Sequence, residues 1–164
     1  MRLNLREILS VPGSSLPFSD VLDLSHLEFF GERPIARPLR VHGQVRNKAG
    51  ALMLEGTADT VLELVCDRCG TPFEKEKSVV LDTLLAAELE NKDSDQIVLL
   101  DGEELDLGEL ASTAFILAMD TKSLCKEDCK GLCSGCGVNL NEAPCRCKPE
   151  VDPRLAALGQ LLDK

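Results

Sequence analysis

Aromatic residues are scarce in this sequence, which has no tryptophan, no tyrosine and five phenylalanines among 164 residues. A hydrophobic core must therefore be built mainly from Leu, Val, Ala and Ile. Basic residues are also outnumbered, with 18 Lys and Arg against 28 Asp and Glu. The resulting net charge of −10 argues against a protein that coats nucleic acid through bulk charge, although it leaves room for a local basic face.

Long hydrophobic runs are missing too. No apolar stretch approaches the roughly 20 residues of a membrane span. The N-terminal MRLNLREILSVPG lacks the continuous apolar run of a signal peptide. We therefore expect a soluble, cytoplasmic protein without a membrane partner. In a reducing cytosol, eight cysteines indicate metal ligands before disulfides.

Catalytic motifs are absent as well: the sequence contains no G-x-S-x-G, no P-loop and no H-E-x-x-H. The two histidines, His26 and His42, stand apart from the cysteine-rich runs, and we expect neither to bind metal. We predict a protein that is not an enzyme, with no catalytic residues and no small-molecule substrate.

Period-two hydrophobicity predicts a strand over residues 36–47, followed by a turn at 47–50. The buried face of this strand would consist of Leu39, Val41, Gly43 and Val45. Further strands are predicted over 51–66, bent near Gly56, and over 71–85. The short turns between them favour an antiparallel meander.

Residues 107–119 have helical spacing, and Asp106 is a suitable N-cap. A short strand is predicted over 96–100, and a short helix over 153–162 behind Asp152. The expected fold class is α+β: an antiparallel meander or barrel-like sheet with a packed helix and a C-terminal, zinc-stapled, Cys-rich tail. We expect a core domain at 1–120, which carries the first cysteine pair at 66–69, and a tail domain at 121–164.

The cysteine spacing predicts two metal sites. Cys66-x-x-Cys69-Gly has the form of a zinc knuckle in a hairpin turn. A second knuckle, Cys133-x-x-Cys136-Gly, is followed by the pair Cys145-x-Cys147, which completes a local set of four. The remaining pair, Cys125 and Cys129, would then join Cys66 and Cys69 in a long-range site. Each site would hold one zinc ion with four cysteine ligands: Cys66, Cys69, Cys125 and Cys129 in one, and Cys133, Cys136, Cys145 and Cys147 in the other.

Structural zinc stabilises finger peptides by roughly 10–16 kcal/mol near neutral pH, enough to order a polar tail. Several alternatives stay open from the residues alone. Cys129 and Cys133 could exchange places, or one pair could be free. An iron–sulfur cluster would use the same ligands. A redox-active Cys66-x-x-Cys69 would need to open a helix, whereas strands are predicted on both sides.

A basic stripe lies between Arg33 and Leu54, a stretch that contains no acidic residue. At about 3.3 Å per residue, Arg40 to Lys48 would span roughly 26 Å, several phosphate spacings. We predict this stripe as an RNA-binding face, and a solvated outer sheet face explains it equally well. Its members are Arg33, Arg37, Arg40, His42, Arg46 and Lys48. Residues 82–109 instead carry ten acidic side chains against Lys92, which suits a solvated loop or a basic protein partner.

Three segments, in this order, resemble the YceD family: Cys66-Asp-Arg-Cys69-Gly-Thr-Pro-Phe73, then Cys129-Lys-Gly-Leu-Cys133-x-x-Cys136-Gly-x-Asn139-Leu-Asn141, then Asp152-Pro-Arg-Leu155-x-x-Leu158. The cysteine-rich tail is similar to one branch of that family, and the first knuckle is its more general mark. The family is linked to accumulation of large-subunit ribosomal RNA.

The resemblance implies a non-enzymatic ribosome-biogenesis factor whose partners are large-subunit precursor rRNA, a ribosomal protein, or both. It brings no established binding residues, so the RNA contacts rest on the charge pattern alone. A protein-only adaptor with an acidic surface for a basic partner, such as a ribosomal protein or a nuclease, is the alternative. A thiol-redox protein is a third reading.

Overall fold

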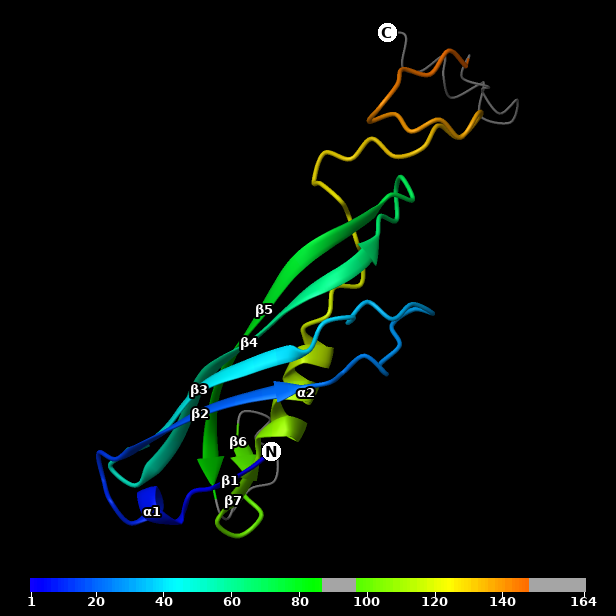
Figure 1. The fold of residues 1–164 in the computed structure, drawn as a ribbon. Coiled ribbons are helices and arrows are strands. Elements are labelled where there is room, and N and C mark those ends of the chain that lie inside the picture. Colours follow the sequence, from blue (N-terminus) through cyan, green and yellow to red (C-terminus); the bar gives the residue numbers. More distant parts are fainter. Residues whose placement is uncertain (87–96, 148–164) are drawn as a thin grey trace, which may run out of the picture. The chain divides into compact units, whose positions relative to one another are not determined.

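The computed structural model describes residues 1–86 and 97–147 (Figure 1). Contacts divide the chain into two units, Met1–Leu64 with Phe73–Thr121, and Val65–Pro72 with Lys122–Lys164. The turn that carries Cys66 and Cys69 thus groups with the tail, and the predicted domains 1–120 and 121–164 stay a prediction. The elements are β1 (Arg2–Asn4), α1 (Arg6–Leu9), β2 (Ser15–Leu22), β3 (Leu39–Lys48), β4 (Ala51–Val65), β5 (Pro72–Ala86), β6 (Ile97–Leu99), β7 (Glu104–Asp106) and α2 (Leu107–Leu117).

The main sheet has five strands in the order β2-β3-β4-β5-β6, and a second, two-stranded sheet pairs β1 with β7. β2, β3 and β4 are antiparallel neighbours, as the predicted meander requires. β6 pairs with β5 in parallel, from Leu84↔Ile97 to Ala86↔Leu99. The sheet is therefore mixed, with β2 and β6 at opposite edges, and the expectation of a barrel-like sheet is wrong.

Strand β3 follows the alternation predicted from the sequence. Leu39, Val41 and Val45 are fully buried, and Gly43 shares their face, whereas Arg40, His42 and Arg46 are exposed on the other face. β3 pairs with β4 from Arg40↔Asp59 to Lys48↔Ala51, and Asn47 to Gly50 form the turn. The predicted strands at 36–47, 51–66 and 71–85 are confirmed, with ends shifted by a few residues.

Strand β2 was not predicted, although it contains the buried Phe18 and pairs with β3 from Leu39 to Arg46. Pro17 in its middle weakens any strand signal because proline cannot donate a ladder hydrogen bond. β2 is an edge strand of the sheet, which is where a proline is tolerated.

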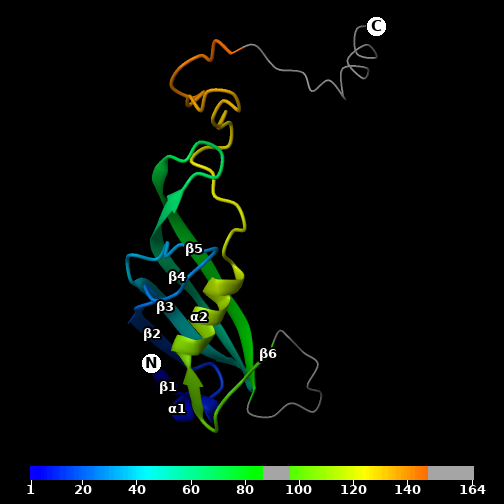
Figure 2. The same cartoon turned by 90° about the vertical axis from the view of Figure 1, so that its right-hand side faces the viewer.

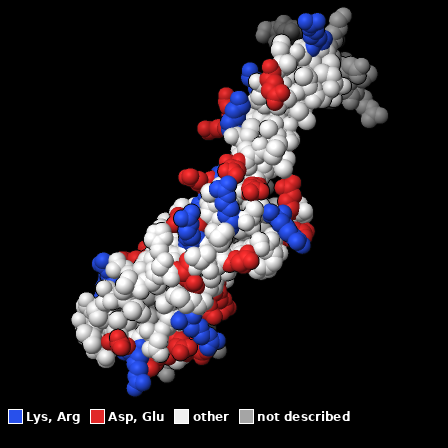
Figure 3. Space-filling view, in the orientation of Figure 1, with Lys and Arg blue, Asp and Glu red and all other residues white. Residues whose placement is uncertain are grey.

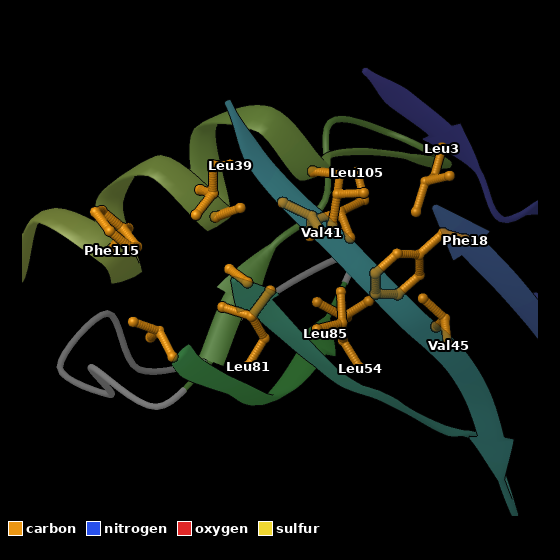
Figure 4. Packing of buried hydrophobic residues seen from close by; sticks show 14 of the residues in the cluster. Leu3, Phe18, Leu39, Val41, Val45, Leu54, Leu81, Leu85, Leu105 and Phe115 are labelled. Carbon is orange, nitrogen blue, oxygen red and sulfur yellow. The ribbon is translucent and has the colours of Figure 1, made fainter. Parts of the chain in front are cut away.

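Helix α2 packs on one face of the main sheet (Figure 2). Its N-cap is confirmed, since Asp106 Oδ1 accepts a hydrogen bond from the Glu109 N–H at 3.0 Å. Figure 4 shows Phe115 of this helix in the same packed layer as Leu39 and Val41 of β3. The predicted helix over 107–119 is confirmed with its end two residues earlier, and its last residue, Leu117, is 80 % exposed.

Asn47 is one of the few buried polar residues, with 2 % of its surface exposed. Its amide donates to the carbonyls of Ile8 and Leu9 at 2.7 and 3.1 Å, and its Oδ1 accepts from the Gly50 N–H at 2.8 Å. These bonds satisfy the end of the short helix α1 and close the β3–β4 turn at once. The side chain thereby ties the N-terminal segment to the sheet.

The predicted helix over 153–162, with its Asp152 cap, and the acidic segment 87–96 lie outside the described residues. Among the helices of the part that is described, none has the length and apolar character needed to cross a bilayer.

A row of close contacts crosses the sheet where Phe18, Gly43 and Gly56 are neighbours in register. A Cβ at Gly43 would lie 2.3 Å from the Glu55 carbonyl oxygen and 2.8 Å from Phe18 Cζ. The absence of side chains at Gly43 and Gly56 is what lets the tip of the Phe18 ring lie close to both strands.

We therefore expect Gly43→Ala to destabilise the chain by about 1–3 kcal/mol, the usual cost of overpacking. Urea unfolding would measure the loss. The control is Gln44→Ala on the outward face of the same strand, which should change stability little. Equal stability of the Gly43→Ala and parent proteins would contradict the packing described here.

Asp120 lies just beyond α2, and its carboxylate contacts Lys75 Nζ at 3.0 Å and Lys77 Nζ at 3.2 Å. The hydrogen bond from Lys75, reinforced by Lys77, lowers the pKa of Asp120. A lowered folded-state pKa means that the stabilisation is present above the unfolded pKa of about 3.9 and is lost as the pH falls through the folded value.

Asp120→Asn should therefore reduce stability at neutral pH by at most about 1 kcal/mol, because the pairs are partly exposed. The difference from the parent protein should shrink as the pH falls below the unfolded pKa of about 3.9 and should vanish below the lower folded-state pKa. Urea unfolding over a series of pH values from 7 downward tests this. Asp82→Asn, at an exposed carboxylate on β5, should show neither effect.

Candidate metal centre

The first cysteine pair sits in the tight turn between β4 and β5. The Cys66 N–H donates to the Thr71 carbonyl at 3.0 Å, and the Gly70 N–H donates to the Cys66 carbonyl at 2.8 Å. Gly70 has a φ of +67°, a left-handed conformation that glycine adopts without strain. This turn points both sulfurs to the same side, where Cys66 and Cys69 are 2 % and 6 % exposed.

Cys125 and Cys129 complete a group of four around this turn. The Sγ atoms of Cys66 and Cys129 are 3.8 Å apart, and those of Cys69 and Cys125 are 3.7 Å apart. All four sulfurs lie within 4.8 Å of one another. The structure thus brings together the long-range set that the sequence arithmetic predicts.

Hydrogen bonds hold the tail segment against the turn. Asp67 and Ser123 exchange two of them: the Asp67 N–H donates to the Ser123 carbonyl at 2.9 Å, and the Ser123 N–H donates to Asp67 Oδ2 at 2.6 Å. Arg68 Nη1 donates to the Cys129 carbonyl at 2.9 Å. Asp67 and Arg68, the two residues between the knuckle cysteines, therefore position the partner cysteines.

The second group consists of Cys133, Cys136, Cys145 and Cys147. Cys133 and Cys145 have their Sγ atoms 3.1 Å apart, and Cys136 and Cys145 have theirs 3.6 Å apart. The second knuckle turns at Gly137, whose φ is +72° and whose N–H donates to the Cys133 carbonyl. This group is more open than the first, because Cys136 and Cys147 are exposed.

Two asparagines that sequence reasoning left without a role link the second knuckle to the first group. Asn141 Nδ2 donates to Cys129 Sγ at 3.3 Å, and Asn141 Oδ1 accepts from the Lys130 N–H at 2.9 Å. Asn139 Oδ1 in turn accepts from the N–H and the side-chain amide of Asn141. The motif Asn139-Leu-Asn141 directly after the second knuckle was the available signal.

The local hydrogen bonds set the protonation of the thiols. The backbone N–H of Cys125 lowers the pKa of Cys66 to about 6, whereas burial and the neighbouring thiols raise the pKa of Cys125 to about 12. In the second group, the Cys136 N–H lowers the pKa of Cys133 to about 6, and the Cys145 thiol raises that of Cys147 to about 12. Each group therefore combines a ready thiolate with thiols whose protons a bound cation would displace.

Both donor sets fit a single tetrahedral ion. Four sulfurs at about 2.3 Å from zinc lie about 3.8 Å from one another. Four of the pairwise separations are 3.1–3.8 Å, close to that value, and all sulfurs of each group lie within 4.8 Å of one another. They exceed a disulfide bond of about 2.05 Å. A cluster of several iron and sulfide ions would push the cysteine sulfurs farther apart, so the spacing favours one ion per group.

The family model described as large ribosomal RNA subunit accumulation protein YceD matches residues 54–162, a stretch that contains all eight cysteines. The chain belongs to the YceD family. No solved structure gives a significant match.

Curated relatives of this YceD-family chain come from bacteria and plants. An uncharacterised protein of Mycobacterium tuberculosis is 32 % identical over 125 residues, covering 73 % of this chain and 59 % of the relative. The chloroplastic large ribosomal RNA subunit accumulation protein YCED homolog 1 of Zea mays is 27 % identical over 181 residues, covering 90 % and 61 %. Its Arabidopsis thaliana counterpart is 26 % identical over 162 residues, covering 80 % and 50 %. The chain spans about three fifths of the length of the first two relatives.

In this YceD-family chain the predicted basic stripe runs along the outward face of β3 and the segment before it. Four of the six residues of the stripe lie within ion-pair distance of a carboxylate. Lys48 and Arg46 pair with Glu55 at 2.9 and 3.9 Å. Arg37 pairs with Glu74 at 2.6 Å.

The imidazole of His42 lies 3.7 Å from Asp59 and 3.3 Å from the Thr57 hydroxyl. The side chains of Arg33 and Arg40 make no ion pair or hydrogen bond with another described residue. Figure 3 shows the same mixture, with basic and acidic side chains interspersed over the first unit. These pairs could not be predicted from the spacing along the chain, because the carboxylates come from β4 and β5.

We expect Cys129→Ser and Cys136→Ser each to lower the metal content by about one ion per chain, since each removes one of four ligands from a different site. Elemental analysis of protein purified without chelator measures this. Ser134→Ala, between the ligands of the second knuckle, should keep both ions.

Alkylation supplies an independent readout. Cys66 should resist iodoacetamide in the metal-loaded protein and react once the metal is chelated, because a coordinated thiolate is not free to attack. Metal-free protein with a protected Cys66, or full metal content in both cysteine variants, would contradict the two-site description.

Proposed function

We propose that the protein is a ribosome-biogenesis factor that supports accumulation or processing of large-subunit ribosomal RNA by binding, without catalysis. Membership of the YceD family supports the biological setting. The cysteine groups support a binding role: in each, four protein sulfurs would occupy every position of a tetrahedral ion and leave none for a substrate.

Zinc is the proposed metal. Thiolate-rich tetrahedral sites favour zinc, and the sulfur spacing suits a single ion. Cys66, Cys69, Cys125 and Cys129 would hold one ion, and Cys133, Cys136, Cys145 and Cys147 the other. Bound in this way, zinc would fix the turn and the tail as one rigid surface. The proposed site of action is the cytoplasm, while the plant relatives are named chloroplastic.

The basic stripe is the proposed contact with precursor rRNA. Arg33 and Arg40 are free within the described chain to bind phosphate. Arg37, Arg46 and Lys48 would have to exchange a carboxylate for a phosphate, which moderates the affinity. A factor that must leave the maturing subunit benefits from such moderated binding, since phosphate contacts otherwise dominate affinity.

Arg40→Glu combined with Arg46→Glu should weaken binding to large-subunit rRNA fragments. It should also reduce the slope of log K against log salt by roughly two, because each lost phosphate contact removes about 0.7–0.9 from the slope. Fluorescence anisotropy over a salt series measures both quantities.

Arg6→Glu is the control, since it reverses an exposed charge on α1 outside the stripe and should leave the slope unchanged. Unaltered binding by the double variant would show that the stripe is only a solvated sheet face. Thermal melts of all variants would verify that they are folded.

A protein-only adaptor is the second candidate, and the ion pairs across β3, β4 and β5 favour it. They neutralise most of the stripe while the whole chain keeps a net charge of −10. Two zinc ions bound to eight thiolates would make the chain more negative still. On this reading, a ribosomal protein would remain bound after nuclease treatment, and no affinity for rRNA fragments would be found.

A further inference from the structure

A groove of about 480 Å³ lies in the first unit between one face of α2 and the strands β6 and β7. From the helix it is lined by Glu109, Leu110, Ala114 and Leu117, which share a face at helical spacing. Val98 and Leu99 of β6 form the opposite wall.

The lining is apolar at the base and at two points on its edge. Leu105 at the base is 2 % exposed, whereas Leu99 is 52 % and Leu117 80 % exposed. Two leucines left open to solvent on opposite walls cost free energy unless something covers them. The volume lies in the range that accommodates a bound ligand or a few inserted side chains.

The charge around the groove is negative. Asp101, Glu104, Asp106 and Glu109 line it against a single cation, Arg2. Arg2 is spread over three of these carboxylates at 3.7, 3.7 and 3.9 Å, so it neutralises none of them closely. RNA phosphate would be repelled here, and a cation would be attracted.

We propose that this groove binds an amphipathic, basic helical segment of a partner protein, with aliphatic side chains between Leu99 and Leu117 and Lys or Arg side chains on the carboxylates. Such helix-in-groove recognition uses anchors at helical spacing. This proposal adds to the proposed function a surface for a basic protein partner. It rests on the proposed function only in taking that partner to be a component of ribosome assembly. The basic stripe on β3 is not part of this site.

The test uses the full, metal-loaded chain and a fluorescein-labelled designed helix with leucines on one face and lysines on the other. We expect saturable binding that is weakened about tenfold by Leu117→Asp, the effect of losing one buried leucine contact. Glu109→Lys should weaken binding at low salt and much less at high salt, because screening removes the attraction.

Matched controls separate the groove from general surface effects. Val80→Asp places the same charge at an equally exposed apolar position on β5, which is outside the groove. Glu7→Lys makes the same charge reversal on α1. Both should bind the helix as the parent protein does. A peptide of the same composition with scattered leucines should bind at least tenfold more weakly.

The proposal fails if Leu117→Asp binds normally or if the scattered peptide binds equally well. It also fails if an RNA oligonucleotide displaces the helix from the groove.

Sedimentation supplies another contradicting result: a dimer that Leu117→Asp dissociates would assign the groove to a second copy of this chain. If the helix does not bind while the stripe variants still lose rRNA, only the groove proposal falls. If the helix binds and no rRNA or ribosomal protein is found, only the proposed function falls.

Discussion

The second unit depends on the requirement that four sulfurs converge on one point. Its described tail residues contain no helix, and their strand pairing is a single isolated bridge between Leu132 and Asn139. Little apolar surface is available there to offset the chain entropy. The turn at Cys66 and Cys69 and the later Cys125 and Cys129 are therefore held by backbone hydrogen bonds and by the thiol group itself. Asn141 extends this support to the second knuckle.

In the first unit, the basic side chains on the outward face of β3 are paired with carboxylates of neighbouring strands. Glu55 forms ion pairs with two basic side chains of β3, Arg46 and Lys48. The hydrogen bond from Lys48 lowers the pKa of Glu55. Cross-strand pairs of this kind leave only part of the positive charge for a ligand. Carboxylates outnumber basic side chains near α2, β6 and β7, where Arg2 is shared among three of them. Under the two proposals above, these two faces would bind partners of opposite charge.

Much of this organisation could be predicted where the signal is local. The alternation of apolar and polar residues predicted β3, and the Asp106 cap predicted the start of α2. The cysteine spacing predicted the division into two groups of four. Non-local features were out of reach. β2 contains a proline that suppresses its strand signal, and the parallel pairing of β6 with β5 cannot be read from the sequence of either strand. The ion pairs of Arg37 and Arg46 depend on which strands become neighbours, which no spacing along the chain reveals.

The long separation between the two halves of the first cysteine group has a consequence for biosynthesis. The β4–β5 hairpin would leave the translating ribosome with only Cys66 and Cys69, two of the four ligands that the proposed metal needs. Coordination could close only after Cys125 and Cys129 have emerged, when the residues of the first unit have already been made. The sheet would therefore have time to form before the proposed metal is captured, and the supply of free metal would act on the final stage of folding rather than on its beginning.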